Sequence, residues 1–385
     1  IFACVGFTYG LTPIIGAMYA RGETDRIGRA VRVGIWVNTL FTIAVASIML
    51  GIYFNLHRLG QPDELMPLIR PYYLIVLSGM LPVCIFNVLA QWSFGCNDTA
   101  LPTWIVLAAN AVNIFGNYLL IYGNWGLPEL GLTGAGISTL TARFICMGAI
   151  LWVFFGTWRG APYIAGFRAK ADKSDGMFRR VAATGFPVSM QMTFETASFS
   201  GSAIMAGWIG AVSLAAFQIV AISGMLGFCI YYSIGAAMAI PLSQAAGTGD
   251  RAAMRRTAWG GYHLILATMV LVSALFTLGG SHIMGLFSSD PAVIGLAVTL
   301  IVPLVLYQFG DATQISFANA LRGTSHVMPM LYIAFVSYIV IGLPCTYLLA
   351  FPAGLGLYGI VLSFSVCLLV AAVLYLYFFL RATRK

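Results

Sequence analysis

Two carboxylic acids lie in the middle of long apolar stretches, where acidic side chains are rare. Glu195 is at the centre of the stretch 181–208, and Asp311 lies within 292–320. A charged side chain costs about 3 kcal/mol or more to insert at the centre of a bilayer, so an acid in a membrane-spanning helix has a functional role by default. The other acids of the chain fall in loops or near the ends of apolar stretches. These two side chains are therefore the first candidates for chemistry.

A polar stripe accompanies each acid. Within 181–208, steps of four, three and four residues connect the polar positions, which places them on one face of a helix. Within 292–320 the polar positions are three residues apart, and a tyrosine lies one turn before the acid. The first stripe consists of Gln191, Glu195, Ser198 and Ser202, and the second of Tyr307, Gln308, Asp311 and Gln314. Such stripes face the interior of a helical bundle or a water-filled cavity.

The residue types of the two stripes suit a cation site. A carboxyl group removed from water can hold a proton, or it can exchange the proton for a hard cation such as Na⁺, with amide and hydroxyl oxygens as additional ligands. We expect the two carboxylates within about 10 Å of each other around a shared polar cavity, since buried charges interact over such distances. The alternative is that both acids only form hydrogen bonds that stabilise helix packing.

Soft and aromatic side chains flank the two acids. A pocket for flat, lipophilic cations requires a carboxylate, aromatic faces and adaptable methionines. Met190, Phe194 and Phe199 lie close to Glu195 in the sequence, and we expect them as candidate substrate contacts. The same residue types are also common in helical cores and at lipid-facing positions.

The first half of the chain offers polar candidates of a different kind. Asn113 and Asn117 share one face of the stretch 101–122, and Arg143 is the third charge within an apolar stretch. The asparagines could line a cavity or form hydrogen bonds between helices. The arginine could pair with an acid, line the cavity, or reach backbone carbonyls or the bilayer surface.

The composition identifies the medium in which these residues act. Of the 385 residues, 60% are hydrophobic and 8% are charged, against about 25% charged residues in soluble domains. A chain with so little charge is solvated by lipid, and its net charge of +8 indicates membrane orientation rather than nucleic-acid binding. The seven cysteines form no CxxC pair, and the sequence contains no HExxH motif. We therefore expect a transporter without a cofactor, with a membrane-embedded enzyme, receptor or channel as the alternatives.

Eleven apolar stretches are each long enough to cross the hydrocarbon core as a helix, which takes about 20 residues. They span 1–20, 33–54, 71–94, 101–122, 134–158, 181–208, 211–240, 258–280, 292–320, 327–350 and 357–380. Only the segment 159–180 is polar, basic and long enough to be a linker. We expect an all-α integral membrane protein with two bundles, an N-terminal lobe (1–158) and a C-terminal lobe (181–385), joined by a cytoplasmic linker (159–180).

An internal repeat relates the two lobes. Residues 93–102 (SFGCNDTALP) match 320–329 (ALRGTSHVMP) in length and in the closing proline, and GLTG at 131–134 matches GLYG at 356–359. Two lobes of like topology are typical of transporters that rock one lobe against the other around a central cavity. The stretch 181–208 has no counterpart in the first lobe, so we expect one further helix before residue 1.

The basic residues predict the orientation in the membrane. Of the 20 Lys and Arg residues, all except Arg58, Arg70 and Arg143 collect in loops on one side. Short loops rich in Lys and Arg face the cytoplasm. The C-terminus is therefore expected in the cytoplasm.

Four segments carry a family resemblance. They are GLTPIIGAMYARGETDRIGRA (10–30), FETASFSGSAIMAGWIGAVSLAAFQIV (194–220), AMAIPLSQAAGTGDRAAMRR (237–256) and YQFGDATQISFANALRGTSHVMP (307–329). In order and spacing they resemble the multidrug and toxic compound extrusion (MATE) family, in its NorM-like bacterial branch, over essentially the whole chain. The resemblance implies the twelve-helix fold of that family without its first helix, with family helices 2–6 in the first lobe and 7–12 in the second.

The resemblance also implies a function. The family expels drugs, often cationic and lipophilic, across the bacterial inner membrane in exchange for Na⁺ or H⁺, and we expect a monomeric antiporter of this kind. The family's seventh-helix glutamate falls on Glu195, its tenth-helix aspartate on Asp311, and its fifth-helix polar pair on Asn113 and Asn117. Some members have aspartate at the last of these positions. A lipid-linked sugar flippase of the same superfamily is the alternative, although flippases line their cavities with several basic residues and only Arg143 qualifies here.

Overall fold

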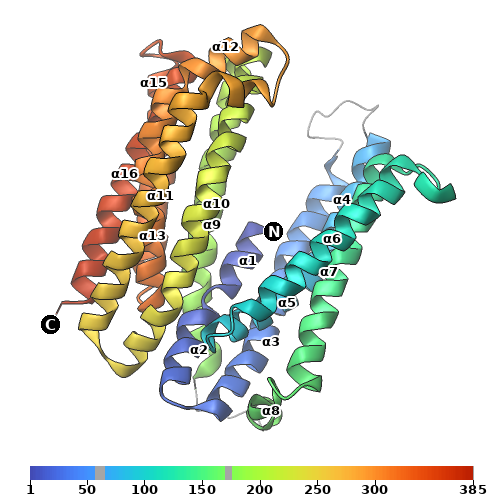
Figure 1. Ribbon diagram of the computed structural model, residues 1–385, viewed down its shortest axis with the longest axis vertical. Helices are drawn as coiled ribbons and strands as arrows, with labels where there is room; N and C mark the ends of the chain where they lie inside the picture. Colours follow the sequence, from blue (N-terminus) through green and yellow to red (C-terminus); the bar gives the residue numbers. More distant parts are fainter. Residues whose placement is uncertain (57–65, 170–175, 385) are drawn as a thin grey trace. The chain divides into compact units, whose positions relative to one another are not determined.

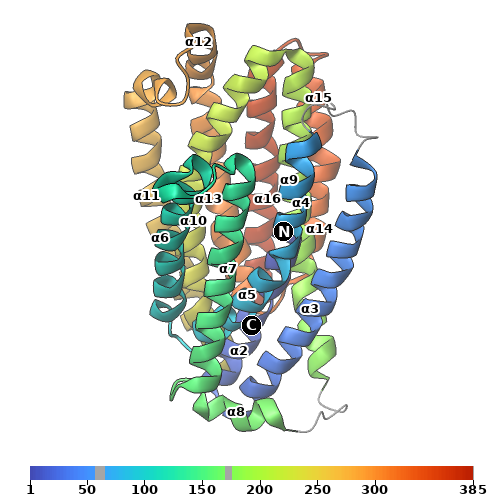
Figure 2. The ribbon, with the colours of Figure 1, turned by 90° about the vertical axis from the view of Figure 1, so that its right-hand side faces the viewer.

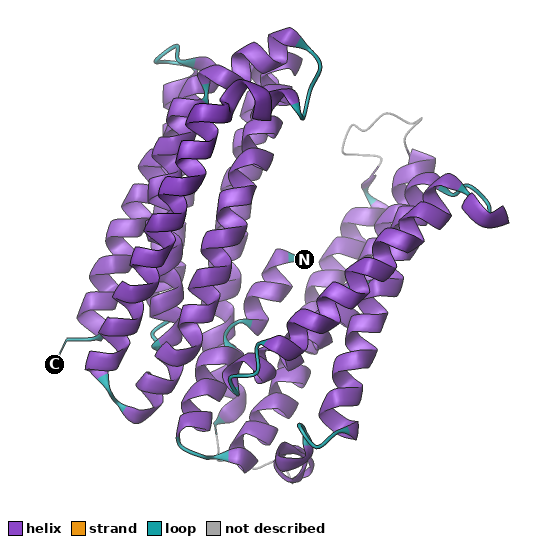
Figure 3. Ribbon diagram, in the orientation of Figure 1, coloured by secondary structure: helices purple, strands orange, loops and turns teal. Residues whose placement is uncertain are grey.

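The computed structural model describes residues 1–56, 66–169 and 176–384, and every regular element within these ranges is helical (Figure 3). Backbone N–H and C=O groups find no water in hydrocarbon, so a chain this apolar must bond them internally, as a helix does. The chain separates into two compact units, Ile1–Phe186 and Pro187–Lys385.

The first unit contains α1 to α8 and the start of α9 (Figure 1). The helices are α1 (Phe2–Thr8), α2 (Leu11–Ala20), α3 (Thr24–Phe54), α4 (Met66–Ser78), α5 (Met80–Gly95), α6 (Ala100–Tyr122), the short 3₁₀ turn Asn124–Gly126, α7 (Gly131–Gly156) and α8 (Ala161–Arg168). The core lies where α5 packs against α2, α3 and α7. Its buried apolar side chains include Leu11, Ile15, Val88, Leu89 and Phe154.

One apolar stretch of the first unit is broken in two. The stretch 71–94 forms parts of α4 and α5, and the helix is interrupted at Gly79, three residues before Pro82. Proline has no N–H group, and its ring clashes with the carbonyl four residues earlier, here that of Ser78. The proline therefore accounts for the interruption.

The segment 159–180, which the sequence indicates as a linker, contains the short helix α8. This helix packs on α3. Gly28 faces the carbonyl oxygen of Tyr163, and Gly166 faces the carbonyl of Asp25, so that the two backbones touch where neither helix carries a side chain. The segment is thus in part an ordered element of the first unit.

Some predictions concern residues outside the described ranges. Arg58, Lys170, Lys173 and Lys385, which contribute to the predicted orientation, belong to this group, as does part of the predicted linker.

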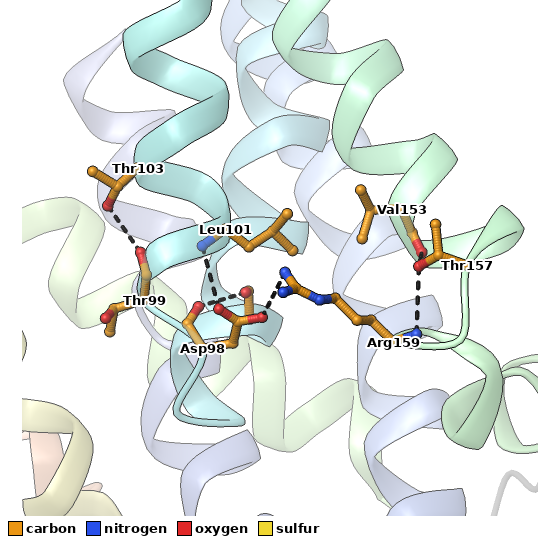
Figure 4. A network of polar contacts seen from close by, with 8 residues as sticks. Asp98, Thr99, Leu101, Thr103, Val153, Thr157 and Arg159 are labelled. Carbon is orange, nitrogen blue, oxygen red and sulfur yellow. Dashed lines mark hydrogen bonds and ion pairs between the residues drawn. The ribbon is translucent and has the colours of Figure 1, made fainter.

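An ion pair joins two loops of the first unit (Figure 4). Arg159 Nη1 lies 3.1 Å from Asp98 Oδ2, and Leu101 N donates a hydrogen bond of 3.2 Å to Asp98 Oδ1 at the start of α6. The backbone N–H of Arg159 donates to Thr157 Oγ1 at 3.4 Å. The pair ties the start of α6 to the end of α7, and because both side chains are partly exposed, water screens their attraction.

The second unit contains most of α9 and all later helices. They are α9 (Met177–Ile209), which begins in the first unit, α10 (Ala211–Thr248), α11 (Arg251–Gly285), α12 (Pro291–Thr299), α13 (Ile301–Gly323), α14 (Met328–Ala334), the π-helix η5 (Phe335–Gly342), α15 (Leu343–Ala350) and α16 (Gly356–Ala382). The central helix is α13, which packs against α10, α11 and α16 (Figure 2). All of its residues from Gly310 to Gly323 are buried. Protein therefore encloses the polar residues of this helix.

The protein is an all-α membrane protein. In the described chain, nine helical stretches are long and apolar enough to cross a membrane, counting α1 with α2, α4 with α5, and α14 through α15 as one stretch each. The number is ten if α12 and α13, which meet at a bend of 50°, form one broken span. The sequence predicts eleven spans. The helix that makes the difference is α9, which has 33 residues but is less apolar because Gln191, Glu195 and several hydroxyl residues occupy its middle. The predicted stretch 292–320 is the broken span, interrupted at Leu300.

Candidate cation site

Asp311 lies in the middle of α13 and is enclosed by protein. The residue is 5% exposed. Within the ranges that the structure describes, its carboxylate has no hydrogen-bond donor, and its electrostatic neighbour is Glu195. A carboxylate taken out of water without donors is costly unless a proton or a cation accompanies it.

Glu195 lies in the second half of α9 and is partly buried. Gln191, one turn earlier on the same face, donates from Nε2 to Glu195 Oε2 at 3.5 Å. Ser198 and Ser202, the next members of the predicted stripe, are buried on that face. The stripe predicted from the spacing therefore faces protein, and the glutamate is its most exposed member.

The two acids lie within electrostatic reach of each other, although 116 residues separate them in the sequence. A third charge, Arg322 in the last turn of α13, interacts with Glu195. The arginine is 4% exposed, and its Nη1 donates to Tyr232 Oη at 3.2 Å. Two carboxylates and one guanidinium leave this part of the second unit with a net negative charge when all are ionised, which favours a bound cation.

Buried polar atoms without a hydrogen-bond partner in the described chain are concentrated in the second unit. They include Gln191 Oε1, Ser198 Oγ, Ser202 Oγ, Tyr231 Oη, Gln244 Nε2, Gln308 Nε2 and Oε1, Gln314 Oε1, Ser316 Oγ, Asn319 Oδ1, Ser337 Oγ, Tyr338 Oη and Ser365 Oγ. Buried polar groups normally have a partner, so a set of this size indicates a place for water or ions. Most of these atoms are oxygens, the donor type that hard cations such as Na⁺ prefer.

Glycines of α10 bring the second stripe close to its neighbour. Tyr307 Oη lies against Gly224, and both side-chain amide atoms of Gln308 would lie 2.8 Å from a Cβ atom at Gly227. Tyr307 also interacts electrostatically with Asp311. Absence of side chains at these two glycines thus makes room for the polar side chains of α13 beside the acid.

The predicted substrate contacts lie among aromatic side chains. The rings of Phe199 and Phe364 are stacked with centroids 4.5 Å apart, and those of Phe194 and Phe335 meet edge to face at 5.5 Å. Met190 is partly buried. Both phenylalanines pack against the apolar core of the second unit, so a packing role accounts for their positions, and substrate contact stays a prediction.

Asn113 and Asn117 form a separate polar group in the first unit. Asn113 Nδ2 donates to Ser138 Oγ of α7 at 3.1 Å, Ser138 Oγ donates to the Asn113 carbonyl at 2.8 Å, and Asn117 Nδ2 donates to Asn113 Oδ1 at 3.4 Å. Gly116 faces the same serine. The group joins α6 to α7 by hydrogen bonds, and cavity lining by these asparagines stays a prediction.

Arg143 lies at the interruption between α4 and α5. A Cβ atom at Gly79 would contact the arginine side chain, and Tyr72 is its electrostatic neighbour. Within the described ranges no acid pairs with it. The arginine therefore lies beside the helix interruption, and a role for its charge stays a prediction.

Three residues near the acids were missed by the sequence analysis. Arg322 was counted among the loop residues, whereas it continues the buried face of α13, eleven residues after Asp311. Tyr231 and Tyr338 are fully buried beside the acids. The arginine could have been found by extending the helical spacing of the stripe, but tyrosine is too common in membrane helices to be singled out.

A separate hollow of about 710 Å³ lies on the second unit between α11, α13 and α16. Its lining includes Val270, Leu278, Leu306 and Phe309 and contains none of the predicted site residues among the described side chains. Its apolar character suits a lipid chain rather than a cation.

An all-helical membrane protein that encloses two interacting carboxylates on polar stripes belongs to the class of secondary transporters. The family model MatE matches residues 1–119 and 187–348. Because this match covers more than half of the chain, the chain belongs to the MatE family: it is an ion-coupled transporter and not an enzyme.

Individual relatives agree with the family assignment. The chain is 31% identical over 375 residues to the "Probable multidrug resistance protein NorM" of Bradyrhizobium diazoefficiens, covering 94% of this chain and 80% of the relative. It is 29% identical to the protein of the same name from Geobacillus kaustophilus, with coverages of 98% and 83%. Among solved structures, a eukaryotic MATE transporter superposes with a TM-score of 0.87 at 19% identity, covering 100% of this chain and 86% of the other. That last likeness establishes the fold.

Proposed function

We propose that the chain is a secondary active antiporter that exports drugs and organic cations in exchange for Na⁺ or H⁺. The observation that carries the proposal is the pair Glu195 and Asp311, whose charges interact inside the second unit. Relatives from two bacteria are named "Probable multidrug resistance protein NorM", which supports drug-like substrates. The polar stripes supply the additional oxygens that a cation requires.

Alternating access is the proposed mechanism. The N-terminal lobe (1–158) and the C-terminal lobe (181–385), joined by the linker 159–180, rock against each other so that the cavity opens to one side at a time. An ion at the two carboxylates neutralises their charge and favours one state, and a substrate favours the other. Exchange follows because each ligand shifts the same equilibrium in opposite directions.

The membrane arrangement belongs to the same proposal. Eleven helices cross the bacterial inner membrane, with α9 as a span whose polar face is directed into the protein. The C-terminus lies in the cytoplasm, following the distribution of Lys and Arg. A reporter that is active only in the cytoplasm, fused after residue 385, tests this orientation.

Reconstituted transport tests the function. Proteoliposomes are loaded with a fluorescent lipophilic cation, and efflux is followed under an imposed Na⁺ gradient and then under an imposed H⁺ gradient. We expect efflux under at least one gradient, and Glu195→Gln should reduce it at least tenfold, because this nearly isosteric change removes the charge and the titratable proton.

Glu129→Gln is the matched control. This glutamate is exposed between the 3₁₀ turn Asn124–Gly126 and α7, and the same chemical change there should leave efflux intact. Efflux by Glu195→Gln at the rate of the unchanged protein would return Glu195 to a packing role. Transport of lipid-linked sugars instead of the dye would favour the flippase alternative.

A further inference from the structure

A π-helix lies beside α9 close to Glu195 and Asp311. Residues Phe335–Gly342 form this element between α14 and α15. Pro344, the second residue of α15, accounts for it, because its ring excludes the carbonyl of Val340 from the ordinary position and widens the turn before it. π-Helical turns are rare and occur frequently at functional sites.

The π-helix runs beside the part of α9 that carries Glu195. At its start, the ring of Phe335 meets the ring of Phe194 at 5.5 Å. At its end, a Cβ atom at Gly342 would lie 3.4 Å from Ser198 Oγ. Glu195 lies between Phe194 and Ser198 in the sequence, so the middle of the π-helix is opposite this glutamate.

Tyr338 is at that middle position. It lies between Phe335 and Gly342, the two residues of the π-helix that contact α9. It is 1% exposed, and its hydroxyl has no hydrogen-bond partner within the described ranges. The hydroxyl is within electrostatic reach of both Glu195 and Asp311.

Comparison with other tyrosines separates this position from ordinary packing. Tyr375 Oη of α16 donates to the Met330 carbonyl at 3.5 Å, and Tyr73 Oη of α4 donates to the Met49 carbonyl at 2.8 Å. A tyrosine that serves only as a buried ring usually satisfies its hydroxyl in this way. The hydroxyls of Tyr231 and Tyr338 both have no hydrogen-bond partner in the described chain. Of the two acids, Tyr231 interacts electrostatically with Asp311, whereas Tyr338 interacts with both Asp311 and Glu195.

We propose that the Tyr338 hydroxyl oxygen is a ligand for a monovalent metal cation held by Glu195 and Asp311. The inference rests on the proposed function and adds a residue and a specificity to it. A metal cation requires several oxygens around it, and neutral hydroxyls complete the set that two carboxylates begin. A proton bound to one carboxylate requires no such shell. Tyr338 therefore favours a metal ion such as Na⁺ over a proton at this site.

Tyr338→Phe tests the proposal, because it removes one oxygen and keeps the ring. The full chain is purified in detergent, and Na⁺ binding is measured by calorimetry and by the Na⁺-dependent rise in melting temperature, with choline chloride at equal ionic strength as the reference. We expect about tenfold weaker Na⁺ binding, the effect of losing one bond to a charged group. In the absence of Na⁺ the variant should melt no lower than the unchanged protein, because the lost hydroxyl has no protein partner.

Tyr163→Phe is the matched control. Tyr163 is a buried tyrosine of the first unit, and its change should leave Na⁺ binding as it is. Equal Na⁺ affinity of the Tyr338→Phe and unchanged proteins overturns the proposal, and so does a variant that fails to fold or melts lower without Na⁺, since the hydroxyl would then have a structural bond. An equal loss in both tyrosine variants also overturns it.

Transport separates this proposal from the proposed function. In Na⁺-free proteoliposomes with an imposed H⁺ gradient, Tyr338→Phe should retain efflux, whereas it should require about tenfold more Na⁺ under a Na⁺ gradient. If Glu195→Gln abolishes efflux while Tyr338→Phe changes neither mode, the cation site survives and the tyrosine ligand is wrong. If Glu195→Gln retains full efflux, the proposed function itself fails.

Discussion

The side-chain amide of Gln308 on α13 lies directly against Gly227 on α10. A methyl group at position 227 would come within 2.8 Å of both its nitrogen and its oxygen. One turn earlier on α10, Gly224 meets the hydroxyl of Tyr307 in the same way. Gln308 and Tyr307 precede Asp311 by three and four residues. The two glycines therefore set how closely α13 approaches α10 beside this acid.

Gly227→Ala should therefore disturb the site through Gln308. The added methyl forces the amide away from its position, and overpacking of this kind costs about 1–3 kcal/mol. We expect a lower melting temperature and weaker cation-dependent efflux. Gly260→Ala on α11 is the control, because a Cβ atom there meets nothing within 4 Å, and alanine in a helix is favoured over glycine by about 0.5–1 kcal/mol. Loss of stability in the control but not in Gly227→Ala would contradict this account.

Asp311→Asn and Glu195→Gln should not have additive effects. If the two carboxylates hold one cation, either change removes the site, and the double variant binds no more weakly than the weaker single variant. The Na⁺-dependent rise in melting temperature of the four proteins forms a double-mutant cycle that measures the coupling. Losses that simply add on a logarithmic scale would indicate two independent sites.

Asn113→Ala should affect stability more than transport. The asparagine joins α6 to α7 through Ser138, and a hydrogen bond between membrane helices is worth about 0.6 kcal/mol on average. We expect a small decrease in melting temperature with an unchanged response to Na⁺. Abolished efflux at an unchanged melting temperature would instead assign Asn113 to the transport path.

Glu23, in the connection between α2 and α3, should give the protein a small acid sensitivity. The hydrogen bond from Arg21, at 2.6 Å, and the charge of Arg26 lower the pKa of this carboxyl group. Because the folded pKa lies below the unfolded one, the stabilisation is present above the unfolded pKa and is lost as the pH falls through the folded value. Glu23→Gln should make the melting temperature depend less on pH in that acidic range.

The size of this effect should be small and dependent on salt. The pair is largely exposed, so water and ions screen it, and 1 M NaCl should bring the unchanged protein close to Glu23→Gln. Glu129→Gln serves again as the control. A large difference that persists in 1 M salt would mean that Glu23 has a further partner.

The sequence by itself determined the class of protein and showed that two acids lie within long apolar stretches. Low charge and long apolar stretches are properties of each segment alone, and helical periodicity places Gln191, Glu195 and Ser198 on one face without knowledge of the neighbours. The α12–α13 bend was not predicted, although Pro303 lies three residues after Leu300, as Pro82 lies three residues after Gly79. Transfer of side chains from water to lipid depends on local composition, which is why these predictions needed no tertiary information.

Tertiary structure decided which polar residues meet. Glu195 interacts with Asp311, Arg322 and Tyr338, which all lie more than one hundred residues later in the chain. These interactions depend on contacts between helices that are distant in the sequence. Tyrosine and arginine occur at interfaces, in cores and at membrane surfaces alike, so their sequence positions do not distinguish these roles. Only the packing of α9, α13 and the π-helix against one another determines which oxygens surround the two acids.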